Sequence, residues 1–155
     1  KNEQADLNRR AFSALHAHGV AQLAGDNRTE LVAEARALVD EEEWIAKLLA
    51  AVAGDMDPEQ LLAQAAEGRD YLVTGQTCEA HFALAFAPGQ TESGRRTHLE
   101  ACVRTGMVGY IEYEIALGWL RRIAPQDWPV PQGDAPNLRR GPAPSIETVR
   151  PRSAR

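Results

Sequence analysis

Apolar residues recur at steps of three and four over most of the chain, which is the spacing of one buried face of an α-helix. The pattern predicts about six helices, and no alternating strand pattern of useful length accompanies them, so we expect an all-α fold. The second helical stretch either runs unbroken through the acidic run 40–43 or breaks near Asp40, and we favour the break. The expected positions are residues 4–23, 29–52, 58–68, 76–87, 93–105 and 108–123.

Capping and turn residues mark several of the expected helix ends. Asp57 and Pro58 form a strong helix start, with aspartate at the N-cap and proline at the first helical position. Thr29 is expected to cap the second helix, after a glycine-containing turn at 25–27. Residues 69–75 are expected to be a linker. The short turns between the later helices predict stacked antiparallel hairpins.

The chain is acidic and rich in small residues. Hydrophobic residues make up 44% of its 155 residues and aromatic residues only 6%, which favours helices packed at short distance. Its longest apolar patch falls short of the roughly 18 residues of a membrane-spanning helix, so no span is expected. The net charge of −5 disfavours binding to nucleic-acid phosphates. The chain begins with Lys1, so either a signal segment has been removed or the sequence is a fragment.

The composition divides the chain into a helical body, 1–124, and a tail, 125–155, which contains seven of the nine prolines. Such a segment cannot continue a helix or build a core. Two alternatives remain open for it. It is either a disordered tail or an arm in which Trp128, Pro129 and Pro131 fold back over the body, since a large apolar side chain is rarely left in water.

Two cysteines and two histidines occupy matching positions on neighbouring expected helices. Cys78 and His81 lie one turn apart near the start of one helix, and His98 and Cys102 near the end of the next. These ends meet in an antiparallel hairpin, so three alternatives are open: two buried thiols, a disulfide, or a zinc site. The helical register turns Leu99 rather than His98 toward the partner helix, which disfavours zinc. We therefore expect no metal.

No other set of residues has the spacing of a catalytic or cofactor site. His16 and His18 are two residues apart on a helix and therefore point to different faces. Glu112 and Glu114 flank Tyr113, and we expect both carboxylates to be solvated. The sequence contains neither a glycine-rich phosphate loop nor a nucleophile elbow. We therefore expect neither an enzyme nor a cofactor.

Four short motifs follow one another in the second half of the chain: CEAHFAL at 78–84, HLEACV at 98–103, Gly106, and YIEY at 110–113. In this order they resemble a tetratricopeptide repeat (TPR), and Trp44 and Leu61–Leu62 precede them at suitable places. The similarity is greatest to the last repeat of short bacterial repeat proteins, which are often exported or lipid-anchored. The resemblance implies stacked helical hairpins that bind another protein through their inner face, with no cofactor and no reaction.

We therefore expect a non-catalytic module that presents a partly alanine-lined helical surface to a protein or peptide. One alternative is a structural subunit anchored by its proline-rich tail, and another is a small metal-binding or redox protein built on the four Cys and His side chains. We slightly favour an exported, periplasmic location over a cytoplasmic one. The candidates for the inner binding face are Tyr71, His81, Phe86, Tyr110 and Tyr113, and those for structural roles are Cys78, Cys102, Trp44, Trp119 and Trp128.

The last helix of a repeat stack has no following partner and needs a cover for its outer face. Trp119 lies on this helix. Its cover is either Trp128 with the neighbouring prolines or a second protein chain, and both alternatives stay open.

Overall fold

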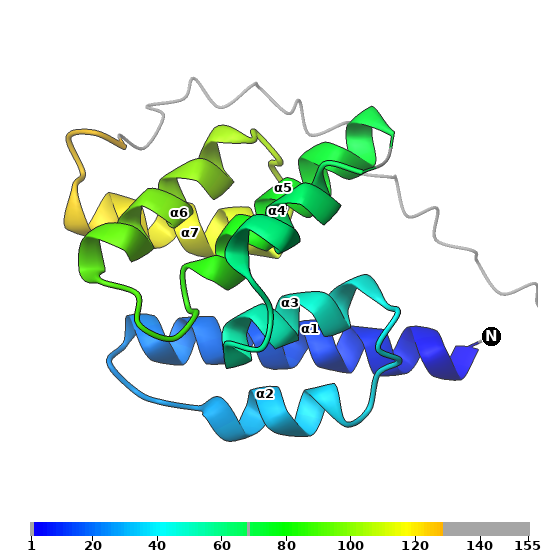
Figure 1. Ribbon diagram of the computed structural model, residues 1–155. Helices are drawn as coiled ribbons and strands as arrows, with labels where there is room; N and C mark the ends of the chain where they lie inside the picture. Colours follow the sequence, from blue (N-terminus) through cyan, green and yellow to red (C-terminus); the bar gives the residue numbers. More distant parts are fainter. Residues whose placement is uncertain (1, 68, 129–155) are drawn as a thin grey trace, which may run out of the picture.

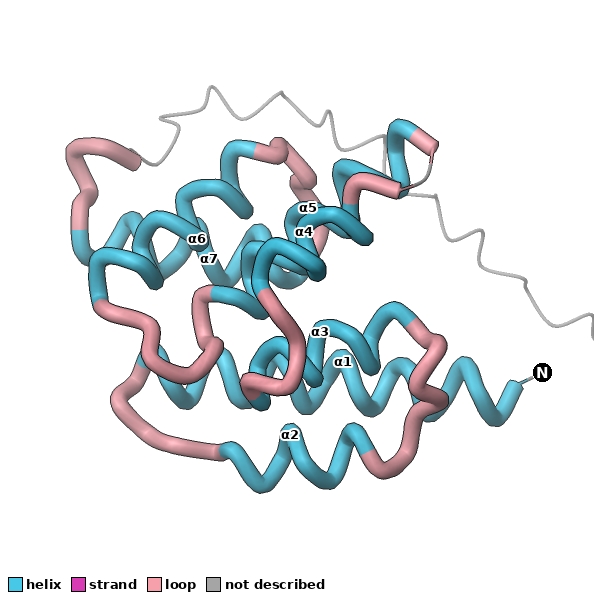
Figure 2. The backbone as a smooth tube through the Cα atoms, viewed as in Figure 1, coloured by secondary structure: helices cyan, strands magenta, loops and turns pink. Residues whose placement is uncertain are grey.

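The computed structural model describes residues 2–67 and 69–128, and this described part folds into seven helices without a strand (Figure 1, Figure 2). The expected all-α fold is confirmed, with one helix more than the sequence pattern predicts. In chain order the helices are α1 (Asn2–Leu23), α2 (Thr29–Arg36), α3 (Trp44–Ala53), α4 (Pro58–Ala65), α5 (Asp70–Leu84), α6 (Glu92–Arg104) and α7 (Ile111–Ile123).

Local capping fixes several helix ends. Asp57 is the N-cap of α4, as expected. Its Oδ1 accepts hydrogen bonds from the backbone N–H groups of Glu59 (2.8 Å) and Gln60 (3.1 Å), and Pro58 follows as the first helical residue. At the other end of the preceding helix, Gly54 adopts a left-handed backbone with φ of 84°, which terminates α3.

Some expected boundaries hold and others are wrong. The break near Asp40 is confirmed, because α2 and α3 are separate helices. Thr29 is the first residue of α2 and not its cap. The expected linker 69–75 belongs mostly to α5, and Gly75 lies within this helix. A Cβ at position 75 would lie 2.7 Å from Tyr110 Oη, so this glycine serves close packing instead of breaking the helix.

The four odd-numbered helices form a closed ring. Helix α1 contacts α3, α3 contacts α5, α5 contacts α7, and α7 contacts α1. Each even-numbered helix covers the junction between the two odd-numbered helices that flank it in sequence. In Figure 1, α1 and α3 lie below α5 and α7. An open stack of hairpins would leave an inner face accessible, whereas closure of this ring turns one face of each odd-numbered helix into the core.

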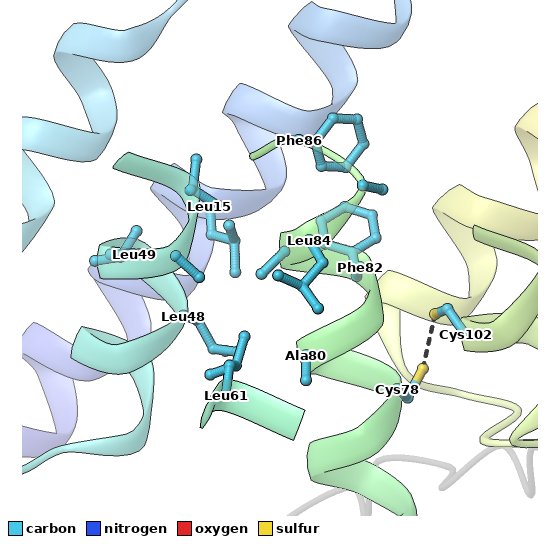
Figure 3. Close-up of a cluster of buried hydrophobic side chains, with 14 of the residues drawn as sticks. Leu15, Leu48, Leu49, Leu61, Cys78, Ala80, Phe82, Leu84, Phe86 and Cys102 are labelled. Carbon is cyan, nitrogen blue, oxygen red and sulfur yellow. Dashed lines mark hydrogen bonds between the residues drawn. The ribbon is translucent and has the colours of Figure 1, made fainter. Parts of the chain in front are cut away.

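The core fills this ring with large apolar side chains (Figure 3). Six of the seven helices contribute such a residue. Removing one of these helices would therefore expose apolar surface, at a cost of about 25 cal/mol per Å². The fully buried residues include Leu15 of α1, Leu48 and Leu49 of α3, Leu61 of α4, Phe82 and Leu84 of α5, Leu99 of α6 and Leu120 of α7.

The chain stays close to the body just after α7. Trp128 is partly buried against the core, and Asp127 accepts a hydrogen bond from Arg96 of α6 at 3.2 Å. Trp128, one of the three residues of the expected folded-back arm, therefore lies against the helical body. Pro129, Pro131 and the remainder of the tail lie outside the described residues.

Candidate functional site

Each odd-numbered helix contributes one polar side chain to a cluster inside the ring. His16 of α1 donates its Nε2–H to Glu112 Oε1 of α7 at 2.6 Å, and Trp44 of α3 donates its Nε1–H to Glu79 Oε2 of α5 at 2.6 Å. Glu112 is only 3% exposed. The two pairs lie close enough for the charges of Glu112 and His16 to act on Glu79. We call these four residues the ring cluster.

Burial changes the acidity of Glu79. The loss of solvation raises the pKa of Glu79 from 4.5 to about 7, although the hydrogen bond from Trp44 acts to lower it. The neighbouring Glu112 raises this pKa further. A carboxyl group that titrates near neutrality can exchange a proton under physiological conditions. The ring cluster therefore links the protonation of Glu79 to the packing of the four helices.

Glu79→Gln should make the protein more stable at pH 8 and leave its stability at pH 5 nearly unchanged. The pKa of Glu79 is about 7 in the folded protein and 4.5 as its ordinary value. The bound proton therefore stabilises the folded state fully below pH 4.5, and this stabilisation is lost as the pH rises through 7. Glutamine carries no charge and still accepts the Trp44 hydrogen bond, so we expect a gain of about 2 kcal/mol at pH 8. Thermal unfolding at both pH values measures the difference.

The matched variant for this comparison is Glu34→Gln, which removes an exposed carboxylate from α2. A Glu79→Gln protein whose stability changed with pH in the same way as the wild type would contradict the buried titration of Glu79.

The burial of Glu112 corrects the expectation of a solvated carboxylate. Glu112 lies four and eight residues before the buried Ala116 and Leu120, on the same side of α7. This spacing in the sequence could have indicated that Glu112 is buried. His16 belongs to the ring cluster, whereas His18 is buried elsewhere against the ring of Phe86, so the two histidines point to different surroundings as expected.

The two cysteines meet as expected, although Cys78 lies in the interior of α5 and not at its start. Cys78 Sγ and Cys102 Sγ lie 2.9 Å apart, and both side chains are fully buried (Figure 3). The hydrogen bond with Cys102 lowers the pKa of the Cys78 thiol, whereas the same contact and burial raise the pKa of the Cys102 thiol. One thiol of the pair therefore donates a hydrogen bond to the other inside the core.

The two histidines of this hairpin also form a pair. His81 Nδ1 and His98 Nδ1 lie 3.1 Å apart and share a hydrogen bond. Leu99 is fully buried, as its register predicted, and the half-buried His98 beside it also reaches α5. Burial lowers the pKa of both imidazoles, and the nearby His98 lowers that of His81 further. Neutral rings at physiological pH can donate and accept within the pair.

The three alternatives for these four residues have different outcomes. Both thiols are free and buried, as the first alternative states. Within residues 2–67 and 69–128, no three His, Cys, Asp or Glu side chains are placed to hold a metal ion, so the thiols and imidazoles form two separate pairs. The disulfide was the second alternative, and the structure instead places the two sulfur atoms 2.9 Å apart as thiols.

Two of the expected binding residues face the interior. Phe86 is 4% exposed and packs edge-on against Phe82, with ring centroids 5.0 Å apart. It is therefore a core residue and cannot contact a partner in this structure. His81 is half-buried in its pair with the α6 histidine. Helix α1 covers Phe86 from the other side of the ring, whereas α6 covers His81 within the same hairpin.

The remaining aromatic candidates are scattered. Tyr110 and Tyr113 are half-buried, the first beside the Gly75 backbone and the second against the core. The side chain of Tyr71 lies outside the described residues, although its backbone belongs to α5. Trp44 belongs to the ring cluster, and Trp119 lines a hollow between α1 and α7. These residues do not form one open binding face.

Known proteins do not supply a family for this fold. Comparison of the chain with protein-family models, curated proteins and solved structures gave no match. Among the helices of the described residues, none combines the length and the apolar content that crossing a bilayer requires. The function must therefore be argued from the surfaces and buried groups of the chain itself.

Proposed function

We propose that this chain is a non-catalytic interaction module that binds a basic, extended segment of a partner protein in a groove between α2 and α4. For this role we propose that three hairpins, α1–α2, α3–α4 and α5–α6, followed by α7, stack in sequence order around the closed ring, so that a partner binds their outer surface. The resemblance to TPRs supports such a role, since stacked helical hairpins present long surfaces to other proteins. The main support for the proposal is this groove.

The groove crosses α3 and has a volume of about 840 Å³. Its walls come from α2 and α4, and we call it the alanine groove. Methyl side chains fill little space, so an extended chain could approach the helix backbones closely. We propose that this surface is the partly alanine-lined face expected from the sequence. The alanines that line it are Ala33 and Ala37 with α2, and Ala46 and Ala50 in α3.

The charge along the groove favours a basic occupant. Glu41 and Glu42 line it, and an adjoining hollow of about 420 Å³ adds Glu67. Arg36 is engaged by Asp55 at 2.5 Å. Lys47 lines both hollows as the second cation, so four carboxylates face two cations there. Electrostatic complementarity of this acidic excess with a basic segment would speed association and set its orientation.

Polar side chains on α4 could hold the backbone of such a segment. Gln60 and Gln64 both line the alanine groove, and each amide offers a donor and an acceptor. The Oε1 atom of Gln64 is buried and has no hydrogen-bond partner within the described residues. Because this oxygen is out of contact with solvent, the exposed Gln60 amide is the better placed of the two to hold the backbone of the segment.

Ala33→Trp should weaken this binding. The probe is a synthetic peptide that carries the consensus selected on the wild-type protein from a phage-displayed library of random peptides. We expect the consensus to be rich in lysine and arginine. Ala33 is exposed in the groove, so its replacement by tryptophan blocks the site without entering the core, and the dissociation constant should rise at least about tenfold. Fluorescence anisotropy measures this constant.

The matched control is Ala63→Trp, which makes the same change at an exposed position of α4 outside the groove. It should bind the probe as the wild type does. A consensus without basic residues, or equal binding by both variants, would refute the proposal.

A further inference from the structure

Helix α7 turns an apolar face outward that no neighbouring element covers in the described part of the chain. Ile111 is 56% exposed, and Gly118 is also exposed two turns later. Beside them α7 and α1 enclose a hollow of about 320 Å³. We call this surface the α7 face. The hollow is lined by Val20 and Leu23 of α1, by Ala24 just after it, and by Glu114, Ile115, Gly118, Trp119 and Arg122 of α7.

The aliphatic residue at the centre of the α1 side is also open to solvent. Val20 is 50% exposed, and Ile115 and Trp119 are half-buried next to it. Apolar side chains gathered in this way on a small protein are typical of a contact surface, because exposing them to water is costly. The surface lies apart from the alanine groove, since it is built on α1 and α7 and not on α2, α3 and α4.

Gly118 lies at the middle of the α7 face. A Cβ built on it would meet nothing within 4 Å, so no neighbour among residues 2–67 and 69–128 requires a glycine here. Glycine inside a helix costs about 1 kcal/mol relative to alanine. The absence of a side chain does, however, let a second helix pack at short distance across this point.

The charges of the α7 face are arranged symmetrically about this glycine. Glu114 lies four residues before Gly118 and Arg122 four residues after it, so each is about 6 Å from it along the helix axis. If a second α7 packs antiparallel across Gly118, a twofold axis through that point places Glu114 of one copy level with Arg122 of the other. The same pairing occurs twice by symmetry.

We propose that the α7 face binds a second copy of this chain in a twofold-symmetric dimer centred on Gly118. The apolar residues of α1 and α7 supply the contact area, and the two Glu114–Arg122 pairs set the antiparallel register. Exposed ion pairs add little to affinity but disfavour a wrong register. A heterologous helix would lack this self-complementary order of charges, which is why a second copy is the occupant.

Sedimentation equilibrium of the full chain over a wide range of concentrations tests the proposal. We expect a reversible monomer–dimer equilibrium. Gly118→Arg places a bulky charge at the centre of the face and should yield a folded monomer, because its side chain starts in open space. Circular dichroism verifies the fold of each variant. A wild type that stays monomeric throughout, or a dimer that survives Gly118→Arg, overturns the proposal.

Charge exchange tests the register. Glu114→Arg alone brings two arginines together, and Arg122→Glu alone brings two glutamates together, so each should weaken the dimer about tenfold. The double variant restores both attractive pairs and should dimerise as the wild type does. Failure of this rescue, with both single variants folded, overturns the antiparallel arrangement.

Discussion

Replacement of His16 by alanine should destabilise the protein by about 3 kcal/mol. The imidazole of His16 donates to Glu112 at 2.6 Å, and Glu112 is 3% exposed. Its removal leaves a core carboxylate without its partner, and an unpaired buried charge costs more than the pair itself contributes. Urea-induced unfolding at pH 7, followed by circular dichroism, gives the free energy of unfolding.

Two companion variants separate lost pairing from lost packing. Glu112→Gln preserves the shape of the side chain and an acceptor for His16, so its cost should be smaller. The double variant His16→Ala with Glu112→Leu leaves no buried charge and should recover much of the loss caused by His16→Ala alone. A loss below about 1 kcal/mol for the single variant, typical of a surface pair, would contradict the structural role of this contact.

Gly19→Val should destabilise the protein by about 2 to 3 kcal/mol. A Cβ at this position of α1 would lie 2.8 Å from Phe82 Cζ and 2.9 Å from Phe86 Cε2. Both rings are buried, so neither can move aside without disturbing the core. The larger valine side chain would push α1 away from α5. Thermal and chemical unfolding both report the change.

Alanine at two glycines supplies the matched comparison. Gly19→Ala and Gly118→Ala make the same change inside a helix, where alanine is favoured by about 1 kcal/mol. At Gly118 the new Cβ has nothing within 4 Å, so stability should rise in dilute protein. At Gly19 the contact with the two rings should outweigh this gain. Stabilisation at both positions would show that α1 and α5 do not pack as closely as the structure indicates.

Several features of the fold could be predicted because their causes are local. The start of α4 follows from Asp57 and Pro58, which act on backbone groups within three residues of the cap. The meeting of Cys78 and Cys102 follows from the short connection between two helices. The N-terminal part of α5 could not be predicted, because Gly75 gives a breaking signal that only the packing of Tyr110 explains.

At the candidate sites, what the sequence indicated differs more clearly from what the tertiary structure decided. Composition led us to expect an alanine-lined surface, but no local pattern indicated the hollow between α2 and α4 in which we propose to place it. Phe86 was expected on an open inner face and lies in the core, since closure of the ring covers that face. Glu112 was expected in water, although its spacing from Ala116 and Leu120 pointed inward.

The sequence by itself determined the all-α class and most helix positions, because periodicity, caps and turns act over a few residues. Only the tertiary structure decided that the odd-numbered helices close into a ring and that His16 and Glu112, 96 residues apart, pair inside it. Such contacts depend on the packing angles of several helices together. Side-chain volumes distributed over the whole core set those angles, and no local pattern records them.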